Sequence, residues 1–322
     1  MAIIKLIPAC KSYLWGGQRL KTNFHKKFDG NVLAETWELS CHPDGPSAVA
    51  NGPFAGKTLA EYLKANPAAA GTNCARFGDF PVLIKLIDAH NNLSIQVHPN
   101  NDYALKNEHQ FGKTEMWYIV DCEPGAFLYY GFKKTISKEE FQKRIEDGTL
   151  TEVLNAALVH PGDSFFIEAG TIHAICKGIV IAEIQQNSNV TYRVFDYNRV
   201  GKDGKPRQLH VSKALDVTRT VPPRTDYDFD SHLGCCNSFV TDLLQLSGNE
   251  VTASTDGSTF HSLLAVKGSG SVSCSGETVS FEQGDSIFLP ADCGSYRVSG
   301  QCTVVRTTVP PKNTYLPNGD KA

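Results

Sequence analysis

The 322-residue sequence has no block of acidic or basic residues and no long apolar run. Its 31 lysines and arginines nearly balance its 34 aspartates and glutamates, and the net charge of −3 favours neither nucleic acid nor an anionic membrane surface as a partner. No apolar stretch approaches the roughly 20 residues of a membrane-spanning helix. Because Lys5 and Pro8 interrupt the apolar start of the chain, we expect no signal peptide.

Paired cysteine motifs are also absent. The chain has 10 cysteines, but none form a C-x-x-C pair, and the adjacent Cys235 and Cys236 are poorly placed to bridge each other. A chain of this length does not need disulfide bonds for stability. We therefore expect reduced thiols in a cytoplasmic protein, with the cysteines packed as small apolar residues.

Helix signals are few, and most of the chain has the pattern of β-strands. Pro81–Ile87 is a short apolar run of the kind that forms a strand covered on both faces. Residues 115–120 and 126–132 are joined by a Pro-Gly turn, which predicts a hairpin. Two further strands are expected over 179–185 and 191–195.

Three short helices are expected between the strands. Thr58 is a suitable N-cap for a helix that ends before Pro67. Ser137 followed three residues later by Glu140 has the pattern of a capping box, and it predicts a second helix. Residues 151–158 are the candidate for a third.

Four residues, spread over about a quarter of the chain, have the chemistry of one metal site: Gln96, His98, Glu115 and His173. Gln96 and His98 are two residues apart, so on a strand both side chains point to the same face. Two imidazoles, one carboxylate and one amide oxygen suit a borderline divalent metal such as Zn²⁺. Ligands two apart on a strand, combined with a distant Glu and His, resemble the cupins, which are β-barrels that hold a metal inside.

A short segment of the chain is repeated. Gly162–Ile167 recurs as Gly284–Leu289, and this Gly-Asp turn followed by a strand resembles a recurring cupin element. Eleven residues after each glycine the chain has His173 in the first copy and Ser295 in the second, so the second copy lacks that ligand. His261, also in the second copy, is expected to be an ordinary packing or surface residue.

The repeat predicts a mainly β protein with two cupin-like (jelly-roll) β-barrels and a few short helices. The proline-rich stretch 221–225 lies between the two copies and is the expected boundary. We therefore predict a catalytic barrel with the metal site and small helical insertions over 1–220. Residues 226–322 would form a second, metal-free barrel.

Several strings of residues resemble class I mannose-6-phosphate isomerases, and most closely their short bacterial form. The matching strings are Leu93–Asn100, Gly112–Trp117, Gly170–Ala174, Tyr13–Gly17 and Ala34–Glu38. Each string is modestly specific, and their order and spacing together are highly specific. The last two carry no obvious chemistry, and we interpret them as packing and turn elements.

The resemblance implies one Zn²⁺ per chain, with Gln96, His98, Glu115 and His173 as its ligands. It also implies that Arg193 is the catalytic arginine. An arginine remains charged at working pH and can donate two parallel hydrogen bonds to an anion. Relatives often have Asp at the position of Asn189. Since an amide cannot act as a base, we assign Asn189 to substrate binding.

Further candidates come from strand faces. Ser94 lies two residues before Gln96 and Lys113 two before Glu115, so both share a face with a metal ligand and are candidates for substrate contact. Lys85 lies in an apolar strand, where a phosphate partner would remove the cost of burying its charge. Glu183 is a carboxylate in another apolar strand, and burial would raise its pKa into a range useful for a general base; the alternative is a buried ion pair.

The predicted activity is the zinc-dependent interconversion of mannose 6-phosphate and fructose 6-phosphate through a cis-enediol. Two alternatives remain open at this point. A cupin oxygenase would use Fe²⁺ bound by two histidines and one carboxylate. A non-catalytic sugar-phosphate-binding protein would bind the ligand without turnover. The expected partner is a small sugar phosphate, not nucleic acid or membrane, and the sequence does not indicate an oligomeric state.

Overall fold

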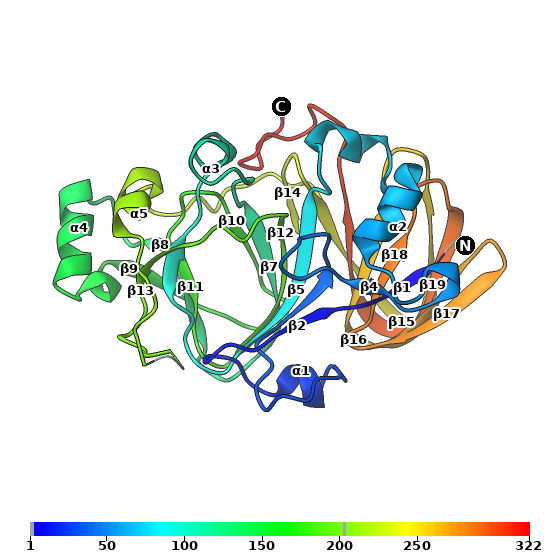
Figure 1. Ribbon diagram of the computed structural model, residues 1–322, viewed down its shortest axis with the longest axis horizontal. Coiled ribbons are helices and arrows are strands. Elements are labelled where there is room, and N and C mark those ends of the chain that lie inside the picture. The colour runs from blue at the N-terminus through cyan, green and yellow to red at the C-terminus, as the bar shows by residue number, and fades with distance from the viewer. Residues whose placement is uncertain (1–2, 202–203) are drawn as a thin grey trace.

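The computed structural model describes residues 3–201 and 204–322, and its 19 strands form three antiparallel sheets (Figure 1). The first sheet has the order β10-β7-β12-β5-β3-β2, formed by Ser164–Ile167, Glu115–Cys122, Ile179–Gln186, Val82–Ala89, Glu35–Leu39 and Ala9–Lys11. The second has the order β13-β6-β11-β8-β9, formed by Tyr192–Phe195, Ile95–Val97, His173–Ile175, Phe127–Phe132 and Leu154–Leu158.

The third sheet has eight strands in the order β14-β15-β19-β16-β18-β1-β4, with β17 paired to β16. These strands are Gly234–Cys235, Val240–Thr255, Gly294–Thr308, His261–Cys274, Ser286–Leu289, Ile4–Ile7, Ala48–Val49 and Glu277–Glu282. The prediction of a mainly β, cupin-like fold is confirmed. The sheets do not close into continuous hydrogen-bonded barrels: they face one another as open layers.

The six-stranded sheet is the middle layer of the molecule (Figure 1). One of its faces packs against the eight-stranded sheet, where Ile84 and Leu86 share a core with Leu264, Phe288 and Val305. Its other face shares a core with the five-stranded sheet. All eight residues of β5 are buried, as expected for a strand covered on both sides. The polar side chains that β5 carries must therefore find partners inside the protein.

Five α-helices lie around these layers in the described chain: α1 (Arg19–Thr22), α2 (Leu59–Ala65), α3 (Asn101–Asn107), α4 (Lys138–Glu146) and α5 (Val211–Val217). Four 3₁₀ segments accompany them: η1 (Gly52–Phe54), η2 (Pro67–Ala70), η3 (Thr72–Phe77) and η4 (Leu150–Glu152). α4 and α5 cover the outer face of the five-stranded sheet through Phe141 and Ala214. No helix in the described ranges is long and apolar enough to cross a membrane.

The two predicted helix caps are confirmed. Thr58 caps α2 and forms a reciprocal capping box with Glu61. The Ser137 hydroxyl accepts a hydrogen bond from the backbone N–H of Glu140 at the start of α4. The prediction of a helix over 151–158 is wrong, because only one 3₁₀ turn (η4) forms before the chain enters β9. Pairing of β9 with β8 at the sheet edge overrides the weak local helix preference.

The predicted hairpin at 115–132 is also wrong. Both segments are strands, β7 and β8, but β7 pairs with β10 and β12, whereas β8 pairs with β11 and β9. The Pro-Gly turn carries the chain from one facing sheet to the other. The turn was recognised correctly, but a local turn signal does not distinguish pairing within one sheet from a crossing between two.

The repeated segment adopts the same structure in both copies. Gly162 and Gly284 have φ values of +100° and +96°, and each following aspartate accepts a hydrogen bond from the backbone N–H three residues before it. β10 then pairs with β7, and β18 pairs with β16. The order β10-β7-β12-β5-β3 in one sheet corresponds to β18-β16-β19-β15-β14 in the other. The two sheets are therefore related strand by strand.

The N-terminal strands connect the two parts of the chain. β1 pairs with β18 and also with β4, so residues 4–7 and 48–49 extend the sheet that the C-terminal part forms. The chain then passes through β2 into the middle sheet. The division at 1–220 and 226–322 stays a prediction, and hydrogen bonds of the N-terminal segment cross it.

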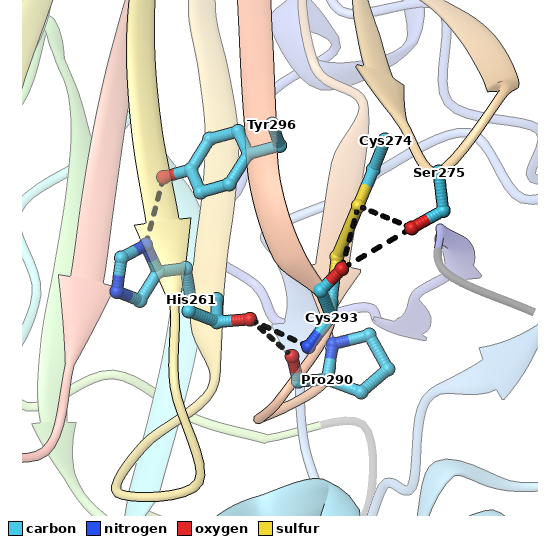
Figure 2. Close-up of a disulfide and its surroundings, with 7 residues drawn as sticks. His261, Cys274, Ser275, Pro290, Cys293 and Tyr296 are labelled. Atoms are coloured by element: carbon cyan, nitrogen blue, oxygen red, sulfur yellow. Dashed lines mark hydrogen bonds between the residues drawn. A yellow bond between two sulfur atoms is a disulfide. The ribbon is translucent and has the colours of Figure 1, made fainter.

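The expectation of reduced thiols is contradicted at one pair of cysteines. Cys274 and Cys293 form a disulfide (Figure 2), while the other eight cysteines are free. β16 ends at Cys274, whose register partner on β19 is Tyr296, and the loop before β19 therefore brings Cys293 alongside. This proximity depends on long-range strand pairing and is not visible in the spacing of cysteines along the sequence.

Candidate metal centre and adjoining pocket

Three of the four predicted ligands meet between the two facing sheets. Glu115 is the first residue of β7, His173 the first of β11, and His98 follows β6 directly. Glu115 Oε1 lies 3.4 Å from His173 Nε2 and 3.8 Å from His98 Nε2. All three residues are buried, and together they form a cluster of the size and composition that holds a metal ion.

Backbone carbonyls fix the orientation of both imidazoles. His98 Nδ1 lies 2.8 Å from the Val190 carbonyl oxygen, and His173 Nδ1 lies 2.8 Å from that of Thr171. Since a carbonyl only accepts, each Nδ1 carries the proton and each Nε2 is left with a lone pair directed toward Glu115. This arrangement is typical of histidines that bind a metal through Nε2.

The site has unpaired polar atoms that a cation would satisfy. His98 Nε2 and Glu115 Oε1 are buried and have no hydrogen-bond partner among the described residues, which is rare for polar atoms in a protein interior. Burial lowers the pKa of His173 to about 4 and that of His98 well below its usual value, so both rings are neutral at pH 7. Burial also raises the pKa of Glu115 to about 7, although Lys113 opposes this shift. Two neutral imidazoles and a carboxylate whose Oε1 is unpartnered among the described residues fit a divalent ion.

Gln96 lies beside this cluster. Its register partner on β11 is His173, and its amide nitrogen is 3.4 Å from His173 Nε2. As placed, the amide oxygen faces Ser94 Oγ at 3.4 Å. Rotation of the amide by 180° would direct its oxygen toward the cluster, as ligation requires. Its position therefore fits the predicted role, and the role itself stays a prediction.

Lys85 and Glu183 are neighbours on β5 and β12, and their side chains form a buried ion pair with Nζ and Oε1 3.0 Å apart. Glu183 also lies 3.5 Å from Lys113 Nζ. Burial alone would raise the pKa of Glu183, but Lys113 and Lys85 together lower it to about 2. The predicted upward shift is therefore wrong, and the alternative of a buried ion pair is correct. The same pair removes the reason for expecting phosphate at Lys85, because Glu183 already balances its charge.

Lys113 links this ion pair to the metal cluster. Its Nζ lies 2.8 Å from Glu115 Oε2, and its side chain is almost completely buried. The sequence argument placed Lys113 and Glu115 on one face because they are two residues apart, and the contact confirms that geometry. Lys113 is thus held between two carboxylates, one in the metal cluster and one in the ion pair.

Arg193 lies on β13, and its register partner on β6 is Gln96. Arg193, Gln96 and His173 therefore form one row across three neighbouring strands of the five-stranded sheet. The Nε of Arg193 is buried without a hydrogen-bond partner in the part of the chain that the structure describes. Burial lowers the pKa of its guanidinium, and the charge of Arg207 lowers this pKa further, to a smaller extent. Arg193 is a half-buried cation that lacks a full set of acceptors.

A pocket opens next to the cluster, and it collects all the predicted substrate and catalytic residues. Its walls include Lys85, Ser94, Gln96, Lys113, Glu183, Asn189 and Arg193. Asn189 is at the exposed rim, where its amide nitrogen contacts the Asp44 carboxylate. Ser94 is buried near Gln96.

The pocket also contains residues that the sequence analysis missed or misassigned. They include Tyr13, Trp15, Glu35, Trp37 and Arg207. The first four belong to the two strings interpreted as packing and turn elements: Trp15 does pack in a hydrophobic core, and all four also line the pocket. Glu35 and Trp37 are two residues apart on β3, and the alternation of strand faces could have indicated them. Arg207 follows the last strand of the first copy, where the sequence carries no periodic signal.

The second copy has different chemistry at the corresponding positions. Glu115 pairs with Ile167 at the end of β10, and His261 pairs with Leu289 at the end of β18. His261 therefore occupies the position of the metal-ligand candidate Glu115. It is buried, and its Nδ1 lies 2.7 Å from the Tyr296 hydroxyl on a neighbouring strand (Figure 2). His261 is a packing residue, as expected.

An ion pair is present at the same place in both copies with its charges exchanged, buried in the first and partly buried in the second. In the first copy, Lys85 on β5 pairs with Glu183 on β12. The residues at the corresponding positions of the second copy are Asp242 on β15 and Arg306 on β19. Arg306 donates two hydrogen bonds to Asp242, of 2.6 and 3.1 Å. The duplicated sheet thus keeps a charge pair at this position.

Comparisons with known proteins agree with this geometry. Residues 3–121 match the family model for the catalytic domain of type I phosphomannose isomerase, and residues 231–309 match the cupin domain of mannose-6-phosphate isomerase. The chain is 38% identical to probable mannose-6-phosphate isomerase GmuF of Bacillus subtilis, over 92% of this chain and 96% of that protein. The chain belongs to the type I phosphomannose isomerase family. The predicted enzyme class, an aldose–ketose isomerase acting on mannose 6-phosphate, is confirmed, and the oxygenase alternative is not supported.

Solved structures of the family have the same fold. The crystal structure of mannose 6-phosphate isomerase from Bacillus subtilis superimposes with a TM-score of 0.87 at 35% identity, covering 95% of this chain and 99% of that one. A mannose 6-phosphate isomerase described as bound with zinc and yttrium gives a TM-score of 0.76 at 18% identity, covering 95% of this chain and 99% of that one. The more distant structure supports the fold alone.

Proposed function

We propose that this isomerase interconverts mannose 6-phosphate and fructose 6-phosphate through a cis-enediol, using one Zn²⁺ per chain bound by His98, Glu115 and His173. The observation that carries this proposal is the pair of buried, unpartnered atoms His98 Nε2 and Glu115 Oε1 beside a polar pocket. Gln96 is proposed as the fourth ligand, through its amide oxygen. A bound Zn²⁺ would polarise the sugar carbonyl and stabilise negative charge on the neighbouring oxygen.

The charge of the pocket suits a sugar phosphate. Its lining includes four cationic side chains, Lys85, Lys113, Arg193 and Arg207, and two carboxylates, Glu35 and Glu183, for a net charge of +2 if all are ionised. A phosphate group carries close to two negative charges at neutral pH. The pocket can therefore accept the substrate without leaving an uncompensated charge.

Arg193 is proposed to stabilise the enediolate or to hold the open-chain sugar. It projects from the strand beside Gln96, and its unpartnered Nε leaves a donor available for a substrate oxygen. Preorganised donors directed at developing charge are among the largest contributions to catalysis. The remaining guanidinium donors allow the same residue to contact a second oxygen.

Lys113 and Glu183 are proposed to act together. Lys113 lies between the Glu115 and Glu183 carboxylates, so it can donate to a substrate oxygen close to the metal cluster. The lowered pKa of Glu183 keeps this carboxylate ionised at neutral pH, where it pairs with Lys85 and lies close to Lys113. An ionised Glu183 can also accept a proton, and its low pKa makes it a weak base.

The remaining pocket residues are proposed to bind sugar hydroxyls. Ser94 offers a buried hydroxyl next to Gln96, and Asn189 offers an amide at the rim. Lys85 is proposed to contact the substrate from within its ion pair with Glu183, since its Nζ has three donors and the carboxylate does not use all of them.

The reaction can be tested by NMR in D₂O with mannose 6-phosphate as substrate. A cis-enediol route removes the C2 proton and delivers a proton to C1, so solvent deuterium should appear at C1 of fructose 6-phosphate. The Glu183→Gln variant should incorporate solvent deuterium more slowly, because the substitution leaves Lys85 and Lys113 facing each other without their shared anion. Product formed without any solvent deuterium, under conditions where an intramolecular transfer is also excluded by C2-labelled substrate, would contradict the enediol.

A further inference from the structure

The loop between β10 and β11 positions His173, and its shape is unusual. It runs from Glu168 to Ile172, and Gly170 has a φ of +89°, a conformation that favours glycine. The backbone N–H of Gly170 donates to the His98 carbonyl oxygen at 2.8 Å, which ties the loop to the second histidine of the cluster. A side chain at Gly170 would lie 2.9 Å from the Val217 carbonyl oxygen, so the loop packs closely against the end of α5.

Arg219, two residues beyond α5, contacts this loop at three points. Its backbone N–H donates to the Gly170 carbonyl oxygen at 2.8 Å. Its Nη2 donates to the Thr171 hydroxyl at 3.0 Å, and its Nη1 forms an ion pair with the Glu168 carboxylate. The Glu168 side chain is only 3% exposed, so this ion pair is largely shielded from water on the side of the loop.

These contacts lead directly to the metal cluster. Thr171, whose hydroxyl is held by Arg219, uses its carbonyl oxygen to accept the Nδ1 proton of His173 at 2.8 Å. That hydrogen bond sets the direction of His173 Nε2 toward Glu115. Partners of this kind typically change metal affinity by 10–100-fold when they are removed. Arg219 is thus two contacts away from the proposed ligand atom.

The same segment of chain also holds the arginine side of the pocket. His210, which precedes α5, donates its backbone N–H to the Arg193 carbonyl oxygen at 2.8 Å and accepts from the Arg193 backbone N–H through its Nδ1 at 3.4 Å. Residues 210–219 therefore connect the strand of Arg193 with the loop of His173. The short helix α5 joins these two contacts, and it fixes the position of Arg193 relative to the metal cluster.

We propose that Arg219 is a positioning residue for the metal centre, and this inference rests on the proposed function of His173 as a metal ligand. Its planar fork of donors satisfies the Glu168 carboxylate and the Thr171 hydroxyl at once, which a lysine ammonium cannot do in the same geometry. Arg219 is not among the described residues that line the substrate pocket. It acts through Thr171 on the orientation of the imidazole.

The test compares Arg219→Lys, Thr171→Val and the double variant with wild type and Arg144→Ala. Arg144 is a matched control, since it is a partly exposed arginine that pairs with Glu152 on α4 and η4, away from the loop. Zinc affinity is measured by competition with a chromophoric chelator, and Co²⁺-loaded protein is examined for its visible absorption bands, which report ligand geometry. Folding is checked by circular dichroism, and Thr171→Val keeps the inference testable if the arginine variant is unstable.

The expected result is a loss of zinc affinity of about 10-fold in each single variant, with altered Co²⁺ bands and no change in Arg144→Ala. The double variant should lose no more than either single variant, because both break the same chain of contacts. Wild-type affinity and bands in folded Arg219→Lys and Thr171→Val would overturn this inference alone. A wild-type protein that binds no zinc would overturn the proposed function, and this inference with it.

Discussion

Among individual side chains, the chemistry depends on polar groups that the fold buries without complete partners. Glu115, His98 and His173 direct lone pairs to a common point, and Arg193 presents an unpartnered Nε in the neighbouring pocket. Buried polar atoms are normally satisfied, so orphaned atoms gathered at one place fit a binding site for a cation or a substrate. Glu183, by contrast, contacts two lysines through its Oε1 and therefore contributes charge balance.

Replacing His98 by Ala should abolish zinc binding and turnover. The substitution removes one of three buried donors and leaves a site too weak to retain the ion. Zinc content after gel filtration and isomerase rate are measured together, and His160→Ala, which changes an exposed histidine, is the control. Retained turnover in a His98→Ala protein that has verifiably lost its zinc would refute the assignment.

Replacing Arg193 by Ala should leave zinc bound but lower kcat by about 10²–10³, as found when a preorganised donor to a developing oxyanion is removed. Arg193→Lys should recover only part of this loss, since one ammonium cannot match a guanidinium fork. Steady-state kinetics with zinc quantified in the same samples provides the measurement. A normal rate in Arg193→Ala would show that the arginine has been misassigned.

His261 should make stability depend on pH. Burial, followed by the charge of Arg306, lowers its pKa from 6.5 to about 4. Between these values the unfolded chain binds the proton and the folded protein does not, so the free energy of unfolding falls as pH decreases from 6.5 toward 4. The full contribution, present above pH 6.5, is about 3 kcal/mol. Urea titrations of wild type and His261→Gln should differ in slope over this range, and equal slopes would contradict the assignment.

His98, Glu115 and His173 were candidate ligands from the sequence, and the structure brings them together; their role as metal ligands stays a proposal. Ligand chemistry and a spacing of two on a strand placed Gln96 and His98 on one face, and the family resemblance supplied Glu115 and His173. The pKa of Glu183 could not be predicted, because its two lysine partners come from β5 and from the residues before β7. Burial and ion pairing shift a carboxylate in opposite directions, and only the three-dimensional neighbours decide which effect is larger.

Strand pairing explains where the element predictions succeeded and where they failed. The helix caps at Thr58 and Ser137 were predictable since they depend on residues within one turn. The partners of β7 and β8 were not, because the Pro-Gly turn between them crosses from one sheet to the other. The repeated Gly-Asp turn was recognised from sequence, and the matching strand order then relates the two copies in detail.

Gly162 and Gly284, the glycines of the two Gly-Asp turns, should differ in their tolerance of a side chain. Both have positive φ, so Ala strains either position by about 1 kcal/mol. A Cβ at Gly162 meets nothing within 4 Å, whereas a Cβ at Gly284 would lie 2.5 Å from the Phe24 carbonyl oxygen. Gly284→Ala should therefore destabilise the protein by about 2 kcal/mol more than Gly162→Ala. Urea denaturation of the two variants is the measurement, and equal losses would contradict the close contact.

The molecule as a whole is a stack of three sheets, and the sheet that faces the pocket packs on the eight-stranded sheet. The middle sheet carries Lys85, Glu115 and Glu183 on the face toward the pocket, while its opposite face packs on the eight-stranded sheet. We propose that residues 1–220 form the catalytic module and 226–322 a metal-free module whose sheet supports it. β1 and β4 belong to the supporting sheet, and this exchange was not predictable because a four-residue apolar strand does not indicate its partner.

The most direct test of the account is fructose 6-phosphate formation from mannose 6-phosphate before and after removal of metal by a chelator, followed by addition of Zn²⁺. The account predicts that chelation abolishes turnover and that about one equivalent of Zn²⁺ per chain restores it, since the buried cluster offers one site. Full turnover in protein shown to be free of metal would contradict the central claim.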